Sequence, residues 1–220
     1  ASNMTSKHQE ANKSDETATE LTLEALASII SSHSKGKQRL IVAIAGPPGS
    51  GKSTSAERLQ TLLENEHKLV TQIVPMDGFH YDNAILKQLG LSHRKGSPQT
   101  FDTGGLASIL ERLANNPTQD IAIPVFDRDI DLSRGSARLV DSQTTVLLVE
   151  GNYLLLKDEG WSNLTQYFDL KVMIACDENK LRSRLMKRWL DLGYGDTEAA
   201  GKVEGNDLMN AKLVINQSAQ

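Results

Sequence analysis

This 220-residue chain contains little cysteine, few aromatic residues and no excess of positive charge. Its one cysteine, Cys176, cannot form an internal disulfide, and its apolar neighbours predict a buried, unreactive strand residue, which fits a reducing cytoplasm. Aromatic residues make up 5%, so the core is expected to be mostly aliphatic. Lys and Arg number 24 against 28 Asp and Glu, which argues against the basic surface that nucleic-acid binding needs.

Long apolar runs are missing as well. No stretch reaches the roughly 18 apolar residues of a membrane span, and the N-terminus lacks a secretory signal, so we expect a cytoplasmic protein without membrane contact. Ala1–Asn3 resemble a remnant of cloning before Met4, and residues 5–20 are polar, so the segment 1–20 is predicted to be flexible. Residues 21–220 are expected to form a single domain.

Apolar runs of strand length alternate with segments of helical periodicity. The strands are predicted at residues 40–45, 70–76, 121–126, 144–149, 170–176 and 213–215. The helices are predicted at residues 21–32, after the glycine-rich turn, and near 83–89, 106–113, 161–168, 178–192 and 196–210. The segments 90–102 and 127–135 are predicted to be loops. This alternation predicts an α/β fold with a mainly parallel sheet.

The segment from Gly46 to Ser53 reads Gly-Pro-Pro-Gly-Ser-Gly-Lys-Ser and matches the P-loop pattern in full. Glycines let main-chain N–H groups approach phosphate oxygens at a helix N-terminus, Lys52 can reach the β- and γ-phosphates, and Ser53 can bind Mg²⁺. A coincidental glycine loop is the alternative, but the motif lies between a buried strand and an amphipathic helix, as a P-loop should. The residues expected to bind ATP are Gly46, Pro47, Pro48, Gly49, Ser50, Gly51, Lys52, Ser53 and Thr54.

Two carboxylates end predicted strands. Asp77 follows the second strand, and the carboxyl ends of parallel strands share one edge of the sheet, so Asp77 could accept a hydrogen bond from an attacking hydroxyl. A turn-forming Asp before Gly78 is the alternative. Glu150 follows a buried aliphatic strand, at the place of the acidic residue that holds Mg²⁺ directly or through water.

Basic residues and a histidine supply further candidates. Asp127 and Arg128 begin a charged loop, in which Arg128 could bind a phosphate or a substrate oxygen, although a solvated loop is the ordinary alternative. Arg184 and Arg188 share one helix face that could close over ATP as a lid around 180–195, or could simply face solvent. His80 could contact substrate, but a lone histidine is more often structural. The opposite helix stripe, with residues 181, 185 and 189, is expected to be core.

Five motifs together resemble those of one family of P-loop kinases, the phosphoribulokinase, uridine kinase and bacterial pantothenate kinase group. The motifs are the P-loop, Met76-Asp-Gly-Phe-His80, Arg94-Lys-Gly-Ser-Pro-Gln-Thr-Phe-Asp102, Pro124-Val-Phe-Asp-Arg128 and Val149-Glu-Gly-Asn-Tyr153. They look most similar to the branch of fructose transport system kinases, which the C-terminal Val203-Glu-Gly-Asn-Asp207 and Asn210 also resemble.

The resemblance implies a three-layer P-loop NTPase fold with about five parallel strands and a helical lid, ATP and Mg²⁺ as cofactors, and a small hydroxyl compound as acceptor. It implies catalytic roles for Lys52, Asp77 and lid residue Arg184 or Arg188, with Ser53 and Glu150 at the metal. The residues expected at the acceptor are Asp77, His80, Arg94, Lys95, Asp127, Arg128 and Asn152. Members of the group are commonly dimeric, so a homodimer is also expected.

The sequence departs from the pantothenate kinases at one place. Phe126 and Arg128 stand where those enzymes usually carry a Tyr and a His, which makes pantothenate less favoured. We therefore expect a kinase acting on a sugar-like metabolite, with pantothenate or a nucleoside as the alternative acceptor. A regulatory ATP-binding NTPase without a small acceptor is the second alternative. A GTPase ranks lower, and the one Asn-Lys-x-Asp match, residues 12–15, lies in the polar segment before the P-loop.

Overall fold

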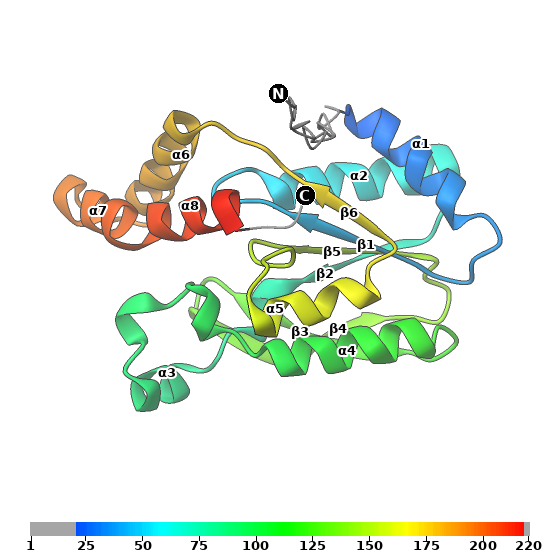
Figure 1. The fold of residues 1–220 in the computed structure, drawn as a ribbon, viewed down its shortest axis with the longest axis horizontal. Coiled ribbons are helices and arrows are strands. Elements are labelled where there is room, and N and C mark those ends of the chain that lie inside the picture. Colours follow the sequence, from blue (N-terminus) through cyan, green and yellow to red (C-terminus); the bar gives the residue numbers. More distant parts are fainter. Residues whose placement is uncertain (1–20, 218–220) are drawn as a thin grey trace, which may run out of the picture.

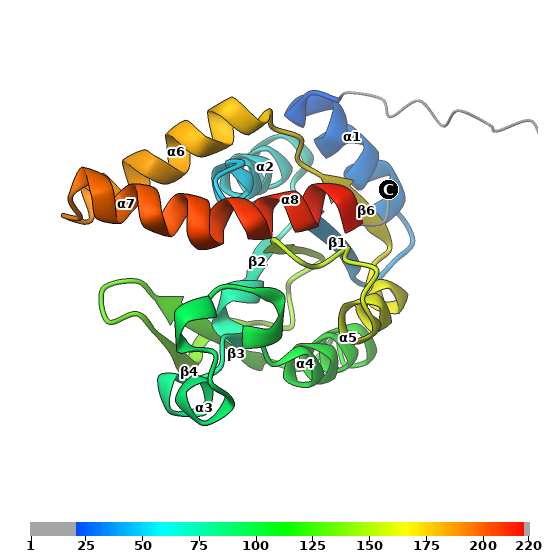
Figure 2. The same ribbon diagram turned by 60° about the vertical axis from the view of Figure 1, so that its left-hand side comes forward.

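The computed structural model describes residues 21–217, apart from the side chains of residues 159, 216 and 217 (Figure 1). The predicted flexible segment 1–20 lies outside the described residues, and the extent of the domain, 21–220, stays a prediction. The fold is α/β, as the alternation of strands and helices predicted. Helices cover both faces of a central sheet, and a group of helices from the C-terminal part extends beyond one end of it (Figures 1 and 2).

The central sheet has four parallel strands in the order β2-β5-β1-β6. The strands are β1 (Leu40–Ala45), β2 (Thr71–Pro75), β5 (Val146–Gly151) and β6 (Leu170–Met173). The expectation of about five strands was therefore one too many. The expected strand at 213–215 is wrong, because these residues lie in the helix α8 (Leu208–Gln217).

Both faces of the sheet are covered, which explains why β1 is apolar at every position. All six residues of β1 are buried. Leu40, Val42 and Ile44 pack with the helices α1 (Leu23–Ser34) and α2 (Lys52–His67). Ile41 and its alternate neighbours pack on the opposite face, in a second core that includes buried leucines of α4 (Thr103–Asn115). The aliphatic core predicted from the composition therefore consists of two layers around the sheet.

An antiparallel hairpin, β3 (Ile121–Asp127) and β4 (Leu132–Val140), lies beside the parallel sheet and is not part of it. The sequence predicted β3 but assigned residues 127–135 to a loop. Residues 128–131 do form a turn, but Asp127 belongs to β3 and residues 132–135 belong to β4, so the prediction was wrong for these positions. The signal for β4 was weak because Ser133, Arg134, Gly135 and Ser136 interrupt any alternation of apolar residues. The turn between the two strands, residues 128–131, carries Arg128 and Asp131 towards the end of the sheet where the P-loop lies.

Residues 178–217 form a separate helical layer, shown in orange and red in Figure 2. It contains α6 (Glu178–Asp191), α7 (Asp196–Lys202), a π-helical segment (Val203–Asp207) and α8. Leu185, Val203 and Leu208 form a small core between these helices. The shorter elements of the chain are α3 (Asn83–Leu89), α5 (Glu159–Ser162) and the 3₁₀ turns Met76–Phe79, Ser92–Arg94, Pro98–Thr100 and Asn163–Tyr167.

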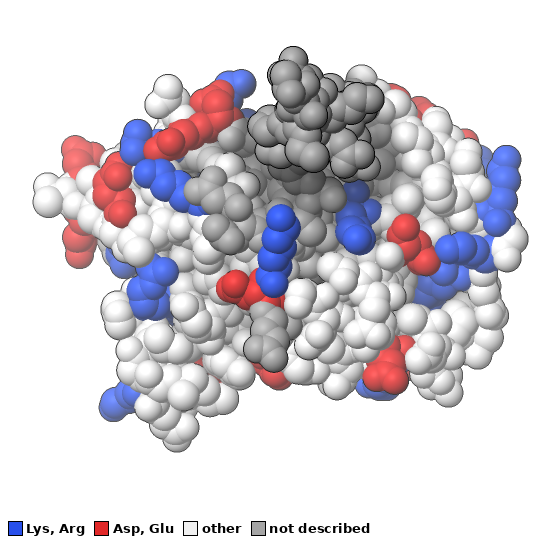
Figure 3. Space-filling model, in the orientation of Figure 1, with Lys and Arg blue, Asp and Glu red and all other residues white. Residues whose placement is uncertain are grey.

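Charge is mixed over the surface drawn in Figure 3, where basic and acidic side chains of the described residues lie interspersed. Within residues 21–217, no helix has the length and apolar character needed to cross a membrane.

Candidate active site

The P-loop joins the end of β1 to the start of α2. Gly49 and Gly51 have φ angles of 80° and 83°, which other residues rarely adopt, and Gly51 is the N-cap of α2. A Cβ on Gly46 would lie 2.7 Å from Ser50 Oγ and 3.1 Å from the carbonyl oxygen of Ile174. The loop therefore needs its glycines, and it leads into a helix N-terminus that favours anions.

Lys52, Ser53 and Glu150 meet directly behind this loop. Ser53 Oγ donates a hydrogen bond to Glu150 Oε1 at 3.3 Å. Glu150 is buried, and this burial raises its pKa, against the opposing effect of the positive charge of Lys52. Burial lowers the pKa of Lys52, and the negative charges of Glu150 and Asp77 oppose that shift. A half-buried cation and a buried carboxylate thus stabilise one another beside the P-loop.

The hydroxyl of Ser53 and the carboxylate of Glu150 are hard oxygen ligands of the kind that Mg²⁺ prefers. In the part of the chain that the structure describes, no group of three or more His, Cys, Asp or Glu residues is placed to hold a metal. A Mg²⁺ ion at this point would therefore complete its coordination with phosphate oxygens and water, which is how this ion is usually bound beside a nucleotide.

Asp77 lies next to this group because of the sheet register. Pro75 at the end of β2 pairs with Glu150, and Asp77 follows in the 3₁₀ turn Met76–Phe79. The β3–β4 hairpin packs directly on this turn, since a Cβ on Gly78 would lie only 2.3 Å from the carbonyl oxygen of Pro124. Ser133 Oγ also donates a hydrogen bond to the carbonyl oxygen of Gly78. This close approach brings Arg128 to Asp77, where the two side chains form an ion pair at 3.4 Å.

The ring of His80 packs with two phenylalanine rings beside Asp77, and these three rings are called the aromatic floor below. The His80 ring lies 4.1 Å from the ring of Phe101 and 4.5 Å from that of Phe126, between centroids. Its Nδ1 lies 2.7 Å from the carbonyl oxygen of Asp77. Burial lowers the pKa of His80, although the nearby carboxylate of Asp77 opposes the shift. The neutral imidazole is therefore favoured at neutral pH.

Arg94 and Lys95 hold neighbouring segments together. Arg94 donates to Asn206 Oδ1 at 2.6 Å and to Asn210 Oδ1 at 3.1 Å, which joins the loop 91–97 to the C-terminal helices. Lys95 Nζ contacts Asn83 Oδ1 at 2.8 Å and pairs with Asp131 Oδ2 at 2.9 Å. One loop thus binds both the helical layer and the turn of the hairpin.

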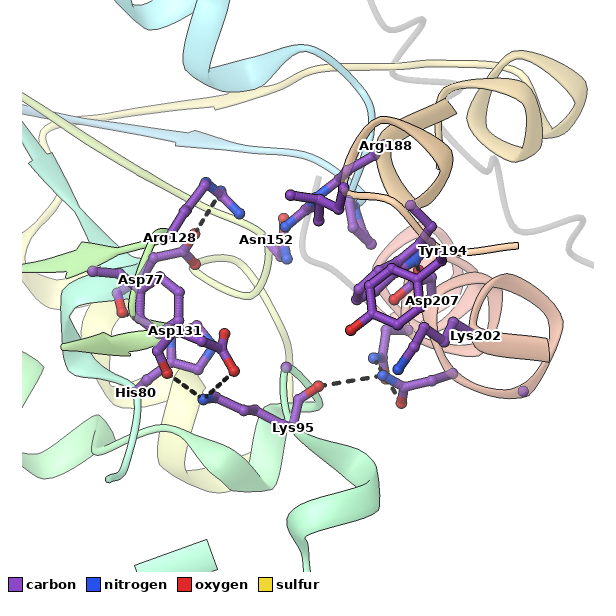
Figure 4. Close-up of a pocket in the computed structure, with 18 of the residues that line it drawn as sticks. Asp77, His80, Lys95, Arg128, Asp131, Asn152, Arg188, Tyr194, Lys202 and Asp207 are labelled. Carbon is purple, nitrogen blue, oxygen red and sulfur yellow. Dashed lines mark hydrogen bonds and ion pairs between the residues drawn. The ribbon is translucent and has the colours of Figure 1, made fainter. Parts of the chain in front are cut away.

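A cavity of about 1320 Å³ extends from the P-loop between two walls. Figure 4 shows Asp77, His80, Lys95, Arg128 and Asp131 on one wall, with Arg188, Tyr194, Lys202 and Asp207 opposite and Asn152 between them. The predicted site residues that line this cavity are Pro48, Lys52, Asp77, His80, Lys95, Arg128, Asn152, Arg184 and Arg188. A smaller cavity of about 600 Å³ adjoins it and is lined by residues that include Ser53, Glu150, Asp77 and Arg128.

Two of the predicted acceptor residues lie outside the lining of both cavities. Arg94 is held by the two asparagines of the C-terminal helices, and Asp127 forms an ion pair with Arg134 at 3.1 Å. Arg184, in contrast, already contacts the P-loop, since its guanidinium donates to the carbonyl oxygen of Gly49 at 3.2 Å.

Asn152 lies where the two walls meet. Its Oδ1 is buried and has no hydrogen-bond partner among the described residues, while the residue lines the large cavity. A buried polar atom without a partner is costly, and a small shift of this side chain would let it accept a hydrogen bond from a ligand in the cavity.

A second group of cavity residues, on the helical wall, was not predicted from the sequence. Trp189 was assigned to the core, and it does pack on the small C-terminal core, but it also lines the cavity. Its ring lies 5.2 Å from that of Tyr194, and Lys202 Nζ lies 4.9 Å from each ring centroid. Its indole N–H donates to Asp207, whose pKa is raised by burial. For these residues, the only sequence signal was the family-like motif at residues 203–210, part of which lines the cavity.

Comparisons with known proteins identify the family. A sequence model of the AAA domain matches residues 42–198. A candidate uridine kinase from Schizosaccharomyces pombe is 30% identical over 187 residues, which cover 82% of this chain and 80% of the relative. The chain belongs to the P-loop kinase family. Such kinases bind ATP together with Mg²⁺.

The kinase also resembles a solved structure and a second group of relatives. The crystal structure of a candidate fructose transport system kinase from Silicibacter sp. TM1040 is 36% identical, with a TM-score of 0.86 over 91% of this kinase and 97% of that chain. Pantothenate kinase from Lactococcus lactis is 31% identical over 153 residues, which are 68% of this kinase and 47% of the relative. The kinase therefore spans about half the length of that pantothenate kinase.

Proposed function

We propose that this kinase transfers the γ-phosphate of ATP to a hydroxyl group of a sugar-like small molecule. One observation carries the proposal. The group Lys52, Ser53 and Glu150 lies beside Asp77 at one end of a large cavity, which continues past Asp77 between two polar walls. An NTPase without a second substrate has no need of that space, whereas a kinase needs it for the acceptor.

At the P-loop end of the cavity, defined as residues 46–54 with Glu150, each side chain has a distinct task. The P-loop N–H groups and Lys52 hold the phosphates of ATP, while Ser53 and Glu150 would hold a Mg²⁺ ion, which would neutralise part of the phosphate charge. Arg184 and Arg188 of α6 face the same cavity and stabilise the charge that develops on the transferred group. The low-dielectric surroundings of Lys52 strengthen its interaction with phosphate.

At the hairpin end, defined as the turn Met76–Phe79, the β3–β4 hairpin and the loop 91–97, Asp77 binds the acceptor hydroxyl. The hydroxyl oxygen forms a bond to the γ-phosphorus, and the bond from that phosphorus to the β–γ bridging oxygen breaks, so ADP leaves. Asp77 accepts the hydrogen bond of the attacking hydroxyl and takes up its proton as the new bond forms. Asn152, which lines the same cavity, is suited to orient a second hydroxyl of the acceptor.

An ATP-consumption assay with Mg²⁺ tests this function against sugars, polyols, sugar acids, nucleosides and pantothenate. The last two are included because the relatives are named as uridine and pantothenate kinases. Stimulation by one class is expected, and ATP consumption that no compound stimulates would contradict the proposal.

The Asp77→Asn variant tests the acceptor role within the same assay. We expect kcat to fall by about 10²- to 10³-fold, because the variant cannot take up the hydroxyl proton. Binding of ATP, measured by titration calorimetry, should change little. Near-normal turnover of Asp77→Asn would show that the carboxylate does not act on the acceptor.

A further inference from the structure

The cations at the hairpin end differ in how far their hydrogen bonds are already used. Lys95 Nζ contacts the carbonyl oxygen of Asp131 at 2.6 Å, Asp131 Oδ2 at 2.9 Å and Asn83 Oδ1 at 2.8 Å. An ammonium group has three N–H donors, so all of them are engaged within the wall. Lys95 is therefore a structural tie between two segments and has no donor left for a ligand.

Arg128 is in the opposite situation. Within residues 21–217 its guanidinium has one hydrogen-bond partner, Asp77 Oδ2, at the long distance of 3.4 Å. A guanidinium carries five N–H donors, and 58% of the Arg128 side chain is exposed. The residue lines both the large and the small cavity. Arg128 is thus a cation with free donors, directly beside the carboxylate proposed to receive the acceptor hydroxyl.

We propose that the acceptor is a hydroxy acid whose carboxylate binds Arg128 while its reacting hydroxyl lies at Asp77. This inference rests on the proposed kinase function. The planar fork of a guanidinium matches a carboxylate in a bidentate arrangement. Because Arg128 and Asp77 are in contact, the hydroxyl and the carboxylate must be separated by only a few carbon atoms. The acceptor class is therefore a short sugar acid or a related polyhydroxy carboxylate.

The ion pair itself favours an acidic acceptor over a neutral one. While Arg128 remains on Asp77, it occupies a carboxylate oxygen that the hydroxyl of the acceptor would use. A neutral sugar offers Arg128 nothing in exchange, whereas a carboxylate gives it a new partner and leaves Asp77 free. A carboxylate that draws Arg128 away from Asp77 Oδ2 thus frees that oxygen for the hydroxyl, which favours an acid over a neutral sugar.

The acidic neighbours favour a carboxylate over a phosphate group. Figure 4 shows Asp77 and Asp131 on the same wall as Arg128. A phosphate monoester carries close to two negative charges at neutral pH, so it meets more repulsion from these two side chains than a singly charged carboxylate does. Lys95 has no free donor for such a group, because its three N–H donors are bound to Asp131 and Asn83.

Matched pairs of compounds test the proposal in the same ATP-consumption assay. The pairs are gluconate with glucose, xylonate with xylose and glycerate with glycerol, and glucose 6-phosphate serves as the phosphate arm. We expect at least one acid to stimulate ATP consumption about tenfold more than its neutral partner. In Arg128→Gln the KM for that acid should rise at least about tenfold, while the KM for ATP stays within about twofold.

Arg134→Gln is the matched control. Arg134 lies on the same hairpin, its side chain is 56% exposed, and it too pairs with one carboxylate, that of Asp127, but it lines neither cavity. This variant should keep the KM of the wild type for the acid. Binding of the acid to the wild type and to Arg128→Gln is also measured by titration calorimetry, in the presence of a non-hydrolysable ATP analogue.

The possible failures are distinguishable. A neutral compound phosphorylated as well as its acid, or an acid whose KM and binding do not depend on Arg128, would overturn the hydroxy-acid assignment and leave the kinase function intact. Stimulation by the sugar phosphate alone would overturn the choice of a carboxylate. A rise in the KM for ATP with an unchanged KM for the acid would assign Arg128 to the nucleotide. If no compound stimulates ATP consumption, the kinase function itself fails.

Discussion

The P-loop end and the hairpin end of the cavity are built in different ways. At the P-loop end, Glu150 lies at the end of β5, and Lys52 follows the adjacent strand β1 through the P-loop. The parallel register between these two buried strands sets the relative position of the two residues. At the hairpin end, Asp77 is placed by a strand as well, but the residues around it come from a hairpin turn and a loop. Ion pairs and hydrogen bonds between exposed or half-buried side chains hold those segments in place.

The difference separates a rigid end from an adaptable one. Burial of aliphatic strands on both faces gives the P-loop end a geometry that no ligand is needed to set. Exposed ion pairs contribute little free energy each, so contacts such as Arg128 with Asp77 can exchange partners when a ligand arrives. Phosphate binding therefore belongs to the rigid end, and the choice of acceptor belongs to the adaptable end.

The largest effect is expected from Lys52→Ala, which removes the half-buried cation of the P-loop end. We expect kcat to fall by about 10²- to 10³-fold for every acceptor, because Lys52 holds the phosphates and stabilises their charge. Steady-state kinetics with ATP and the best acceptor measure this. The KM for the acceptor should change much less than kcat, since Lys52 is proposed to act on the phosphates and not on the acceptor.

Lys87→Ala is the control for that variant, because Lys87 is an exposed residue of α3 and lines neither cavity. It should retain wild-type kinetics. A Lys52→Ala enzyme with kcat within about threefold of the wild type would contradict the division into two ends, because it would mean that the P-loop end does not carry phosphate transfer.

The second-largest effect is expected where the β3–β4 hairpin packs on the turn that carries Asp77. In Gly78→Ala the new Cβ would lie 2.3 Å from the carbonyl oxygen of Pro124, so the hairpin must move away from the turn that carries Asp77. We expect the free energy of unfolding to fall by about 2 kcal/mol, as for other overpacked sites. Urea denaturation followed by circular dichroism measures the change.

Gly135→Ala provides the comparison on the same hairpin. A Cβ at this position would meet no atom within 4 Å, and the φ angle of Gly135 lies outside the left-handed region. The free energy of unfolding should therefore stay within about 0.5 kcal/mol of the wild type. Equal stability of the two variants would show that the hairpin is not held against the turn as tightly as the contact indicates.

The same contrast explains which parts of the fold the sequence could predict. The apolar run Leu40–Ala45 and the glycine pattern after it are local signals, and the structure has the strand and the loop at those positions. The strand β4 gave no such signal, because its residues pair with β3 and only its last residue, Val140, is buried. The segment 213–215 resembles a strand locally, but it continues a helix that packs on residues far away in the chain.

The candidate site follows the same rule. Asp77 and Glu150 were predicted to meet because each ends a parallel strand, and the register places them side by side. The contacts of Arg94 with Asn206 and Asn210 join residues more than 100 positions apart, so no local pattern could show that this arginine is already engaged. Trp189 was assigned to the core for a similar reason, since helical periodicity does not reveal what lies opposite a helix.

A third and smaller effect is expected from Arg94→Ala, which cuts the contact between the loop 91–97 and the helical wall. Two hydrogen bonds are lost, and the free energy of unfolding should fall by about 1 kcal/mol. Because the loop no longer fixes the distance between the two walls, the KM for the acceptor should rise about two- to fivefold, with the KM for ATP unchanged.

Arg112→Ala, an exposed position on α4, should show neither change. Rescue of the acceptor KM by Arg94→Lys would indicate that charge matters more than the paired contacts with the two asparagines. A loss of ATP binding in Arg94→Ala would place this arginine at the P-loop end and contradict the division proposed above.

The smallest effect is a pH dependence of stability that arises at the hairpin end. Burial lowers the pKa of His80 in the folded protein, so the unfolded chain binds a proton more readily than the folded one. The free energy of unfolding should therefore be highest above the ordinary histidine pKa of about 6.5 and should fall as the pH drops through 6.5 towards the lowered value. Urea denaturation of the wild type at pH 7.5 and pH 5.5 measures the loss.

The His80→Asn variant isolates this contribution. It should lose less stability between pH 7.5 and pH 5.5 than the wild type, even though it is less stable at both values for want of the ring contacts with Phe101 and Phe126. His67→Asn, which removes a histidine at the end of α2 outside both cavities, should keep the pH dependence of the wild type. If His80→Asn and the wild type lose the same stability on acidification, the aromatic floor beside Asp77 is open to water. In that case His80 would belong to the adaptable end, together with the residues proposed to hold the acceptor hydroxyl.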